Sequence, residues 1–405
     1  MKMITTIGLL AVTASPAFAA EYIVKLKNSD TSTLKNLKSV RTLNLSFGNF
    51  AVIESDQKLA DLKSLANIEY IEPNFTYKAF TAPTDANFSK QWGLNNDGKN
   101  SGSIWSPGKK GIDISALEAW KITKGNRSVK IAVIDTGVDY NHPDLSKNIM
   151  VNDAELNGTD GVDDDNNGYI DDVYGYDFGN NDNDPMDGHG HGTHCAGVIG
   201  ASHDAQGIAG VMANVQILPI KFLKDNGSGT LEGAIGAIDY AISRGVDIMS
   251  NSWGGPGNSQ ALKEAIIRAR DAGITFIAAA GNSNADNDST MTLPAGYDLE
   301  NIISVGALDG KGKKAGFSNY GKTSVHVFAP GVDIYSTVQN GGYKKMSGTS
   351  MACPHVAGVA GLILSSEPNM SYVDIRARLM ATSIKTSDLS IYTASGYVDA
   401  ALSLK

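Results

Sequence analysis

Apolar and polar residues alternate in short blocks along most of the chain, and these blocks predict strands and helices in turn. Val129 to Ile134 is an almost unbroken apolar run, which is typical of a strand buried on both faces. Residues 231–243 repeat apolar side chains with the spacing of one helical face, and residues 260–270 are amphipathic in the same way. Further buried strands are expected at 216–223, 246–249 and 274–280. Helices between short apolar strands predict an α/β fold with three layers and a mostly parallel sheet.

Residues 20–80 carry a different pattern, which predicts a separate small α+β unit. The expected order is strand, helix, strand, strand, helix, strand, over residues 22–27, 33–39, 41–45, 50–55, 57–66 and 68–71. This is the split βαβ arrangement. A unit of about 60 residues is only marginally stable by itself. The polar stretch at 78–85 is the expected boundary, so the main domain is predicted to span 81–405.

The first residues have the pattern of a secretory signal. Lys2 supplies a positive charge, residues 4–12 are apolar, and Ala17-Phe18-Ala19 gives the small-residue cleavage pattern. The apolar stretch falls short of the ~20 residues that a membrane span needs, so no membrane anchor is expected. We therefore predict a signal peptide at 1–19 and a secreted protein, extracellular or periplasmic.

Composition and charge narrow the class of partner. The chain has 44 glycines and is 42% hydrophobic, which indicates a compact globular protein. Residues 1–80 hold 9 basic and 7 acidic residues, whereas the remainder holds 25 and 36. An acidic main domain argues against nucleic acid as a partner and suits the binding of cations.

Three short motifs carry candidate chemistry. Ser350, within Gly348 to Ala352, opens a segment of small residues that is expected to be helical, where free N–H groups favour negative charge. Asp135 ends the apolar run that begins at Val129, and carboxyl ends of strands are where open α/β sheets build their sites. His191 opens a second helix of small residues.

These motifs resemble the catalytic signatures of the subtilisin-like serine proteases. Asp-Thr-Gly at Asp135, His-Gly-Thr-His at His191 and Gly-Thr-Ser-Met-Ala around Ser350 occur in the order known for subtilisin. The resemblance covers roughly residues 85–403 and implies a serine endopeptidase that acts on proteins or peptides, expected to be a monomer. Residues 20–80 resemble the family's inhibitor-type propeptide, which assists folding and then blocks the cleft. A permanent accessory domain is the alternative.

The roles follow from residue chemistry together with the resemblance. Ser350 is too weak a nucleophile unless His191 takes its proton, and Asp135 would orient the imidazole and stabilise its charged form. Asn282, after an apolar strand, matches the family's oxyanion-binding asparagine. A metal site made by His189, His191 and His194 is the competing interpretation, although no H-E-x-x-H pattern accompanies it.

Substrate is expected to bind as an added strand. The segments that resemble the family's edge strands supply Gly227, Ser228 and Gly229 from one side and Ser252, Trp253 and Gly254 from the other. Ala279, Gly281 and the region of Thr292 are expected to line the pocket for the residue before the scissile bond. No acidic residue is evident there, which favours apolar or aromatic residues at that position.

Calcium is the expected cofactor, in a structural role. Residues 153–187 contain 12 acidic residues and no Lys or Arg, a run that would otherwise be a solvated loop. Asp163, Asp165 and Asn167 alternate and Gly168 follows at the sixth position, as in an EF-hand loop. Tyr174 stands at the twelfth position, so Asp171 or Asp172 must close the site. The resemblance implies a second site, with Asp85, Asp144 and Asp204 as ligands.

The positions of the two cysteines predict where they lie in the fold. Cys195 lies four residues after His191 and Cys353 three after Ser350, so both are predicted below the site, buried and reduced, with a disulfide as the alternative.

Two other classes of function are the alternatives to a protease. An esterase of the α/β-hydrolase type would need Gly where Ala352 stands, and its serine would precede Asp and His. A binding protein on the same scaffold need not keep every catalytic group.

Overall fold

The computed structural model describes residues 20–34, 37–57, 59–74, 82–99, 107–255 and 257–405. The chain divides into two compact units, Met1–Phe80 and Thr81–Lys405. The predicted signal peptide lies outside the described residues.

The N-terminal unit is a four-stranded antiparallel sheet in the order β2-β3-β1-β4. Its elements are β1 (Ala20–Leu26), the 3-10 helix η1 (Ser32–Leu34), β2 (Ser39–Leu45), β3 (Gly48–Ser55), α1 (Leu59–Lys63) and β4 (Ile68–Pro73). The prediction of a helix at 33–39 is wrong at its described residues, of which Thr33 and Leu34 lie in the single turn η1 and Ser39 lies in β2. Ser39 and Val40 pair instead with Glu54 and Ile53 of β3, so the sheet takes the end of that segment.

The C-terminal unit is built on a seven-stranded sheet in which every strand pair is parallel, in the order β11-β10-β9-β8-β5-β7-β6. The strands are β5 (Gly125–Asp135), β6 (Tyr176–Asp177), β7 (Asn214–Lys221), β8 (Ile248–Asn251), β9 (Thr275–Ala279), β10 (Ile302–Leu308) and β11 (Val327–Pro330), with an antiparallel hairpin of β12 (Ile334–Val338) and β13 (Gly342–Met346). The helices are η2 (Phe88–Lys90), α2 (Ala116–Ala119), η3 (Ser146–Asn148), α3 (Asp153–Leu156), α4 (His191–Gly200), α5 (Leu231–Ser243), α6 (Gln260–Asp271), α7 (Thr349–Ser366), α8 (Tyr372–Thr382) and α9 (Ala400–Ser403).

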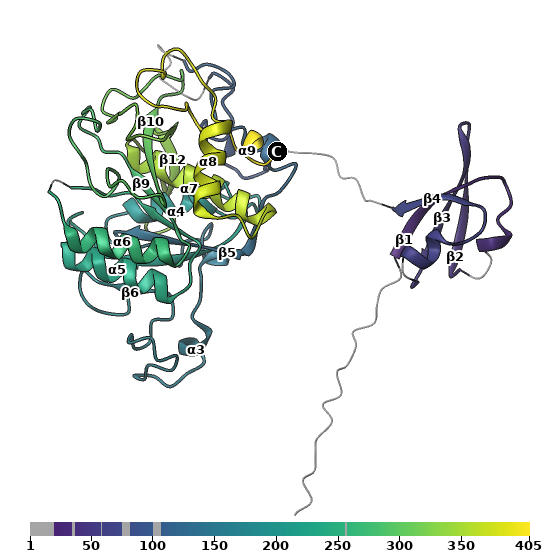
Figure 1. Cartoon of the computed structure of the whole chain (residues 1–405). Coiled ribbons are helices and arrows are strands. Elements are labelled where there is room, and N and C mark those ends of the chain that lie inside the picture. The colour runs from purple at the N-terminus through teal and green to yellow at the C-terminus, as the bar shows by residue number, and fades with distance from the viewer. Residues whose placement is uncertain (1–19, 35–36, 58, 75–81, 100–106, 256) are drawn as a thin grey trace, which may run out of the picture. The chain divides into compact units, whose positions relative to one another are not determined.

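Strand β5 shows why its sequence reads as an unbroken apolar run. Ile131 and Val133 face one core, which contains the buried side chains of α4 and α7. Ala132 and Ile134 face a second core, which contains those of α5 and α6. Because both faces of the sheet are covered, side chains of either parity must be apolar. Figure 1 shows α5 and α6 together on one side of the sheet. The predicted three-layer α/β fold is confirmed.

Helix α7 lies in the middle of this unit, against β5 and β8 to β11. It is long and apolar enough to cross a membrane, but 83% of that window is buried inside the protein. Such burial on all sides is what a central core helix requires.

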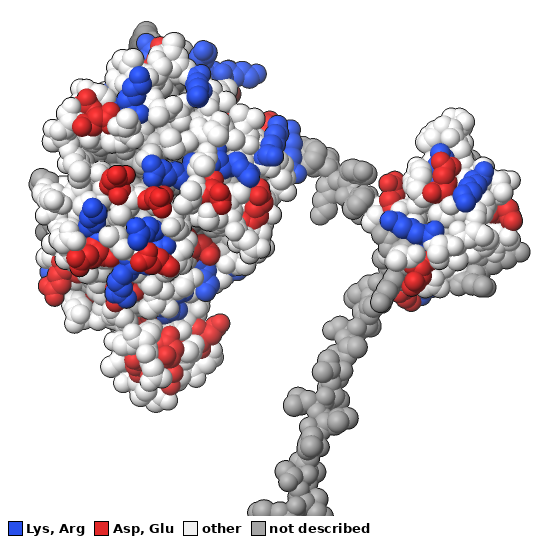
Figure 2. Space-filling model, viewed as in Figure 1, with Lys and Arg blue, Asp and Glu red and all other residues white. Residues whose placement is uncertain are grey.

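Residues 153–187, called here the acidic lobe, connect β5 to α4 and include the short elements α3 and β6. The part around α3 protrudes from the body of the domain in Figure 1. Figure 2 shows acidic side chains on this protrusion.

Candidate active site

Asp135 occupies the last position of β5, with no exposed surface. Its Oδ1 accepts hydrogen bonds from the Thr136 N–H at 2.7 Å and from His191 Nδ1 at 2.7 Å. Its Oδ2 is buried without a hydrogen-bond partner. A buried carboxylate with such fixed contacts can orient an imidazole and stabilise its charged form.

His191 is the first residue of α4, with 21% of its side chain exposed. Burial opposes protonation of the ring, but the negative charge of Asp135 and its hydrogen bond outweigh burial, so the pKa of His191 is raised. The bond to Asp135 occupies Nδ1, which leaves Nε2 as the basic nitrogen.

Ser350 is the second residue of α7, and its Oγ donates a hydrogen bond to the Ser252 carbonyl at 3.0 Å. The Ser252 hydroxyl in turn donates to the Ser350 carbonyl at 2.9 Å. These paired bonds join the start of α7 to the chain that leaves β8. Since a hydroxyl carries one proton, Ser350 must turn from this carbonyl before a base can take that proton.

Asn282 follows β9 and is oriented by the same helix. Its Oδ1 accepts hydrogen bonds from the Thr349 N–H at 2.9 Å and from Thr349 Oγ1 at 3.0 Å. Because the amide oxygen is the acceptor in both bonds, the Nδ2 group remains as the donor on the side chain.

His191, Ser350 and Asn282 line one cleft of about 680 Å³. Six of the predicted substrate-binding residues line it as well: Gly227, Ser252, Trp253, Gly254, Ala279 and Gly281. Ser228 and Gly229 line an adjoining groove of about 550 Å³. None of the described residues that line the cleft is acidic, as the sequence indicated.

The two predicted edge segments lie outside the strands of the sheet. Residues 227–229 follow a turn that the Gly227 N–H closes by donating to the Lys224 carbonyl, and residues 252–254 follow β8. Both segments form walls of the cleft and its adjoining groove, and neither is paired as a strand, since an edge segment becomes a strand only when it has a partner.

The other histidines of the His191 motif occupy different surroundings. The ring of His194 is buried, its Nε2 lies 2.9 Å from the Ile334 carbonyl, and burial lowers its pKa to about 4. The ring centre of His189 lies 6.3 Å from that of His191. Among the described residues, these rings do not form a group of metal-ligating atoms.

Sequence reasoning did not single out Asp187 or Lys221, although both lie close to the triad. Asp187 is 3% exposed and Lys221 is 2% exposed, and both contact Thr136, the residue after Asp135. A buried charge of either sign is rare unless it is paired and hydrogen-bonded. In the sequence, Asp187 looks like an ordinary turn residue before a helix, and Lys221 looks like a lysine at the end of an apolar strand.

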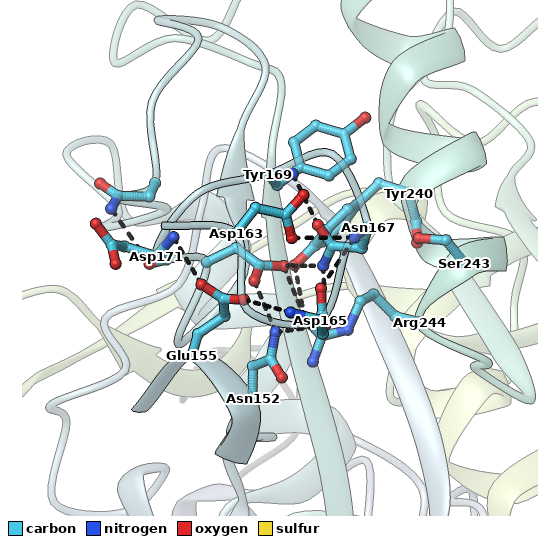
Figure 3. Close-up of polar contacts among 12 residues, drawn as sticks. Asn152, Glu155, Asp163, Asp165, Asn167, Tyr169, Asp171, Tyr240, Ser243 and Arg244 are labelled. Carbon is cyan, nitrogen blue, oxygen red and sulfur yellow. Dashed lines mark hydrogen bonds and ion pairs between the residues drawn. The ribbon is translucent and has the colours of Figure 1, made fainter. Parts of the chain in front are cut away.

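The acidic lobe brings only some of its predicted ligands together (Figure 3). Carboxylate oxygens of Asp165, Asp172 and Glu155 lie within 4.8 Å of one another, and Glu155 was not among the predicted ligands. Asp163 instead accepts the N–H groups of Asn167 and Gly168.

Asp172, fully buried, ties the lobe to helix α5. It accepts hydrogen bonds from Tyr240 and from Arg244 Nη1 at 2.7 Å, and from the Asn167 and Asn152 amides at 3.0 and 2.7 Å. Arg244 compensates the charge of Asp172, and the three neutral donors occupy its oxygens further. Figure 3 shows Asn152, Asn167, Tyr240 and Arg244 close together at the loop.

The second predicted cation site differs from the acidic lobe in that it has buried carboxylate oxygens without hydrogen-bond partners. Asp85 Oδ2 and Asp144 Oδ1 are buried without a hydrogen-bond partner. Asp204 lies beside them, donating its N–H to Asp85 Oδ1 at 3.1 Å, while its carboxylate pairs with Lys147 at 2.6 Å. Burial raises the pKa of Asp144. Orphaned carboxylate oxygens of this kind fit a hard cation such as Ca²⁺.

Cys195 and Cys353 are both unpaired and fully buried. The predicted burial is therefore confirmed, and the two sulfurs are not bridged in the structure. Cys195 Sγ contacts the Ser350 carbonyl at 3.4 Å, and Cys353 lies beneath β8 and β9, near Ser250 and the Ile277 carbonyl.

Comparisons with known proteins agree with this geometry. The profile of the Subtilase family matches residues 126–398. The thermophilic serine proteinase of Bacillus sp. (strain AK1) is 39% identical over 354 residues, which cover 86% of this chain and 77% of that protein. Thermitase of Thermoactinomyces vulgaris is 39% identical over 288 residues, covering 71% of this chain and 92% of its own. A crystal structure of a cold-adapted subtilisin-like serine proteinase superposes with a TM-score of 0.56 at 32% identity, covering 76% of this chain and 98% of that one.

Proposed function

The chain belongs to the subtilase family and is a serine endopeptidase, and from this premise we propose that Asp135, His191 and Ser350 form its catalytic triad. The observation that carries the assignment is the 2.7 Å bond between Asp135 and His191 at the wall of a cleft that Ser350 also lines. The residues come from the end of β5 and the starts of α4 and α7, three elements fixed in one core.

The reaction proceeds by acyl transfer. Ser350 Oγ turns from Ser252, gives its proton to His191 Nε2 and attacks the carbonyl carbon of the scissile peptide. Asp135 stabilises the imidazolium that forms. His191 then gives the proton to the departing amine, which leaves an acyl-enzyme on Ser350. Water, activated by the same imidazole, releases the acyl group and restores the serine.

The developing oxyanion is bound by Asn282 Nδ2 and the Ser350 N–H. Thr349 supports this role, because it consumes the amide oxygen and turns the donor end of Asn282 away from itself. Loss of one such side-chain donor lowers turnover by about 10²–10³, a value known from subtilisin. We therefore expect an effect of that order here.

Substrate binds as an added strand between residues 227–229 and 252–254, with its side chain before the scissile bond between Gly254 and Gly281. The absence of acidic groups among the described lining residues favours an apolar or aromatic side chain there. Glycines at these walls let the substrate backbone approach closely.

The enzyme is made as an exported precursor. Residues 1–19 act as the signal peptide and residues 20–80 as the propeptide, which folds as a unit of its own and is cut from the chain by the enzyme itself. The separate four-stranded sheet supports this division. The mature enzyme is a secreted monomer.

Calcium stabilises the mature domain. Asp85, Asp144 and Asp204 would hold one ion, which would neutralise the orphaned carboxylate oxygens there. In the acidic lobe, Glu155, Asp165 and Asp172 would hold another ion, with Asp163 and Asn167 of the EF-hand-like order beside Asp165. Bound ions of this kind contribute charge compensation and hold loops in place.

The Ser350→Ala variant of the full-length chain tests the proposal. It should fold, remain uncleaved at the propeptide boundary, and show no hydrolysis of a fluorogenic peptide. Ser365→Ala is the matched control, because Ser365 lies on the same helix and donates only to the Gly361 carbonyl. Normal maturation of purified Ser350→Ala, with no other protease present, would reject self-processing. Peptide hydrolysis by the same variant would reject the triad.

A further inference from the structure

Thr136 directly follows Asp135 at the carboxyl end of β5, and all of its polar groups are engaged. Its N–H donates to Asp135 Oδ1 at 2.7 Å. Its Oγ1 donates to Asp187 Oδ1 at 2.9 Å and accepts from the Gly192 N–H at 2.9 Å. Its carbonyl accepts from Lys221 Nζ at 2.8 Å. Thr136 is 1% exposed, so water competes little for these contacts.

Asp187 connects Thr136 to the beginning of α4, the helix that carries His191. Its Oδ1 also accepts the His189 and Gly190 N–H groups at 2.9 and 2.8 Å. Its Oδ2 accepts Thr193 N–H at 2.9 Å and Thr193 Oγ1 at 2.6 Å. One buried carboxylate thus binds donors from β5 and from the first turn of α4. The positive end of this helix and the converging N–H groups balance its charge.

Lys221 holds Thr136 from the opposite side. It ends β7, the strand paired with β5, and its ammonium group donates to the carbonyls of Thr136 and Leu223 and to Asp225 Oδ1, at 2.8, 3.1 and 2.7 Å. All three protons are therefore used. Among its three acceptors, Asp225 alone is charged, and that side chain is 67% exposed.

We propose that Asp187 and Lys221 are positioning residues for the triad, acting through Thr136, and we call the three residues the Thr136 anchor. The buried anion fixes the hydroxyl of Thr136 and the buried cation fixes its carbonyl. The Thr136 N–H then holds Asp135 Oδ1, the same atom that binds His191. The anchor sets the distance between the strand end and the helix start, on which the Asp135–His191 bond depends. This inference rests on the proposed triad.

The expected consequence is a loss of turnover without loss of binding. A displacement of about 1 Å in a catalytic group can cost on the order of 10²-fold in rate. Thr136 lines the cleft, but all of its polar groups are bonded within the protein and none is left to bind substrate. We therefore expect KM to stay nearly constant while kcat falls. A purely structural role would lower the melting temperature and leave kcat of the folded enzyme unchanged.

The test compares Thr136→Val with Thr136→Ser in the full-length chain. Immobilised wild-type enzyme, removed afterwards, cuts the propeptide from every variant, so that slow self-processing does not hide the result. We expect kcat of Thr136→Val to fall about 10- to 100-fold with KM within about twofold, and Thr136→Ser to recover most of kcat. The matched control is Thr393→Val, since Thr393 is also buried and donates to the Val325 and His326 carbonyls away from the cleft. It should lower the melting temperature without the loss of kcat.

Asp187→Asn and Lys221→Met test the two arms of the anchor. Each should lower kcat, and combining Asp187→Asn with Thr136→Val should give less than the product of the single losses, since both break one bond. The proposal is overturned if Thr136→Val keeps kcat within twofold, or if Thr136→Ser falls as far as Thr136→Val. Failure of all anchor variants to fold would also reject it, in favour of a folding role. Activity retained by Ser350→Ala would instead reject the triad itself.

Discussion

The carboxyl end of β5 and the acidic lobe are both crowded with carboxylates, but they use them differently. At the end of β5, Asp135 is buried together with Asp187, the last residue of the lobe segment, and their contacts join different elements of the core. In the lobe, Asp163 and Asp164 accept N–H groups a few residues away in the same loop. The first arrangement positions the proposed catalytic groups, whereas the second folds a local stretch of chain. The presence of acidic residues in a region therefore does not indicate which carboxylate takes part in catalysis.

Asp172 differs from Asp163 and Asp164, although it lies in the same lobe. It is buried and reaches α5 through Arg244 and Tyr240. Removing one partner of a buried ion pair is costly because the other charge stays buried. We therefore expect Asp172 to matter for stability, and Asp135 for turnover.

The largest expected effect comes from exchanging these two carboxylates for amides. Asp135→Asn should lower kcat by about 10⁴, because the amide cannot hold the required His191 tautomer or stabilise its charge. Asp172→Asn should lower the melting temperature while kcat at 25 °C falls less than about threefold. Peptide hydrolysis and thermal unfolding of both variants measure this. Equal losses of kcat would show that the two regions do not differ as described.

The contribution of bound calcium to stability should differ between the acidic lobe and the site formed by Asp85 and Asp144. Free ion at 100 times its dissociation constant would stabilise the native state by about 2.7 kcal/mol. Asp144→Asn should remove more of this stabilisation than Asp163→Ala combined with Asp165→Ala, because only the first site has orphaned buried oxygens. Melting temperatures with calcium and with chelator report the difference. The distinction fails if the double variant abolishes the whole calcium effect.

A smaller effect concerns the pH dependence of the catalytic end. Burial acts against a charged His191, but the charge of Asp135 raises its pKa above the ordinary ~6.5. His191 must be neutral to act as a base, so kcat/KM should rise with pH and reach half of its plateau above ~6.5. Replacing the lobe carboxylate Asp163 with Asn should leave this midpoint unchanged. A wild-type midpoint below the ordinary value would contradict the raised pKa.

The smallest effect is expected at the thiols beneath the site. Burial raises the pKa of Cys195 well above its usual value and that of Cys353 to about 11, so both should react slowly with alkylating reagents in the native protein. In denaturant, intact mass should show two added groups without prior reduction. A requirement for reductant would mean that the two sulfurs are bridged in solution.

Much of the fold was predictable because its signals are local. Helix α5 spans 231–243 as its apolar spacing predicts, and the buried run at 129–134 lies within β5. The failed helix at 33–39 shows the limit, since long-range pairing with β3 decided its structure. Local propensity is a weak prior when a sheet competes for the same residues.

For the site, the sequence supplied residue types but not their partners. Motifs named Asp135, His191, Ser350 and Asn282. The structure brings the last three to one cleft and places Asp135 behind it, bonded to His191. The bond from Thr136 to Asp187 spans 51 positions, and that from Arg244 to Asp172 spans 72. Contacts at such separations leave no periodic trace in a single sequence. For that reason the Thr136 anchor and the place of Glu155 had to come from the structure.

The central position of α7 affects how this enzyme is inactivated. The helix supplies Ser350 at its first turn and much of the core along the rest of its length. Loosening of surface loops therefore leaves the nucleophile in place, and the serine is displaced only when the core itself opens. Heat inactivation should then follow the rate of global unfolding, so that the shelf life of the enzyme is set by the height of the unfolding barrier.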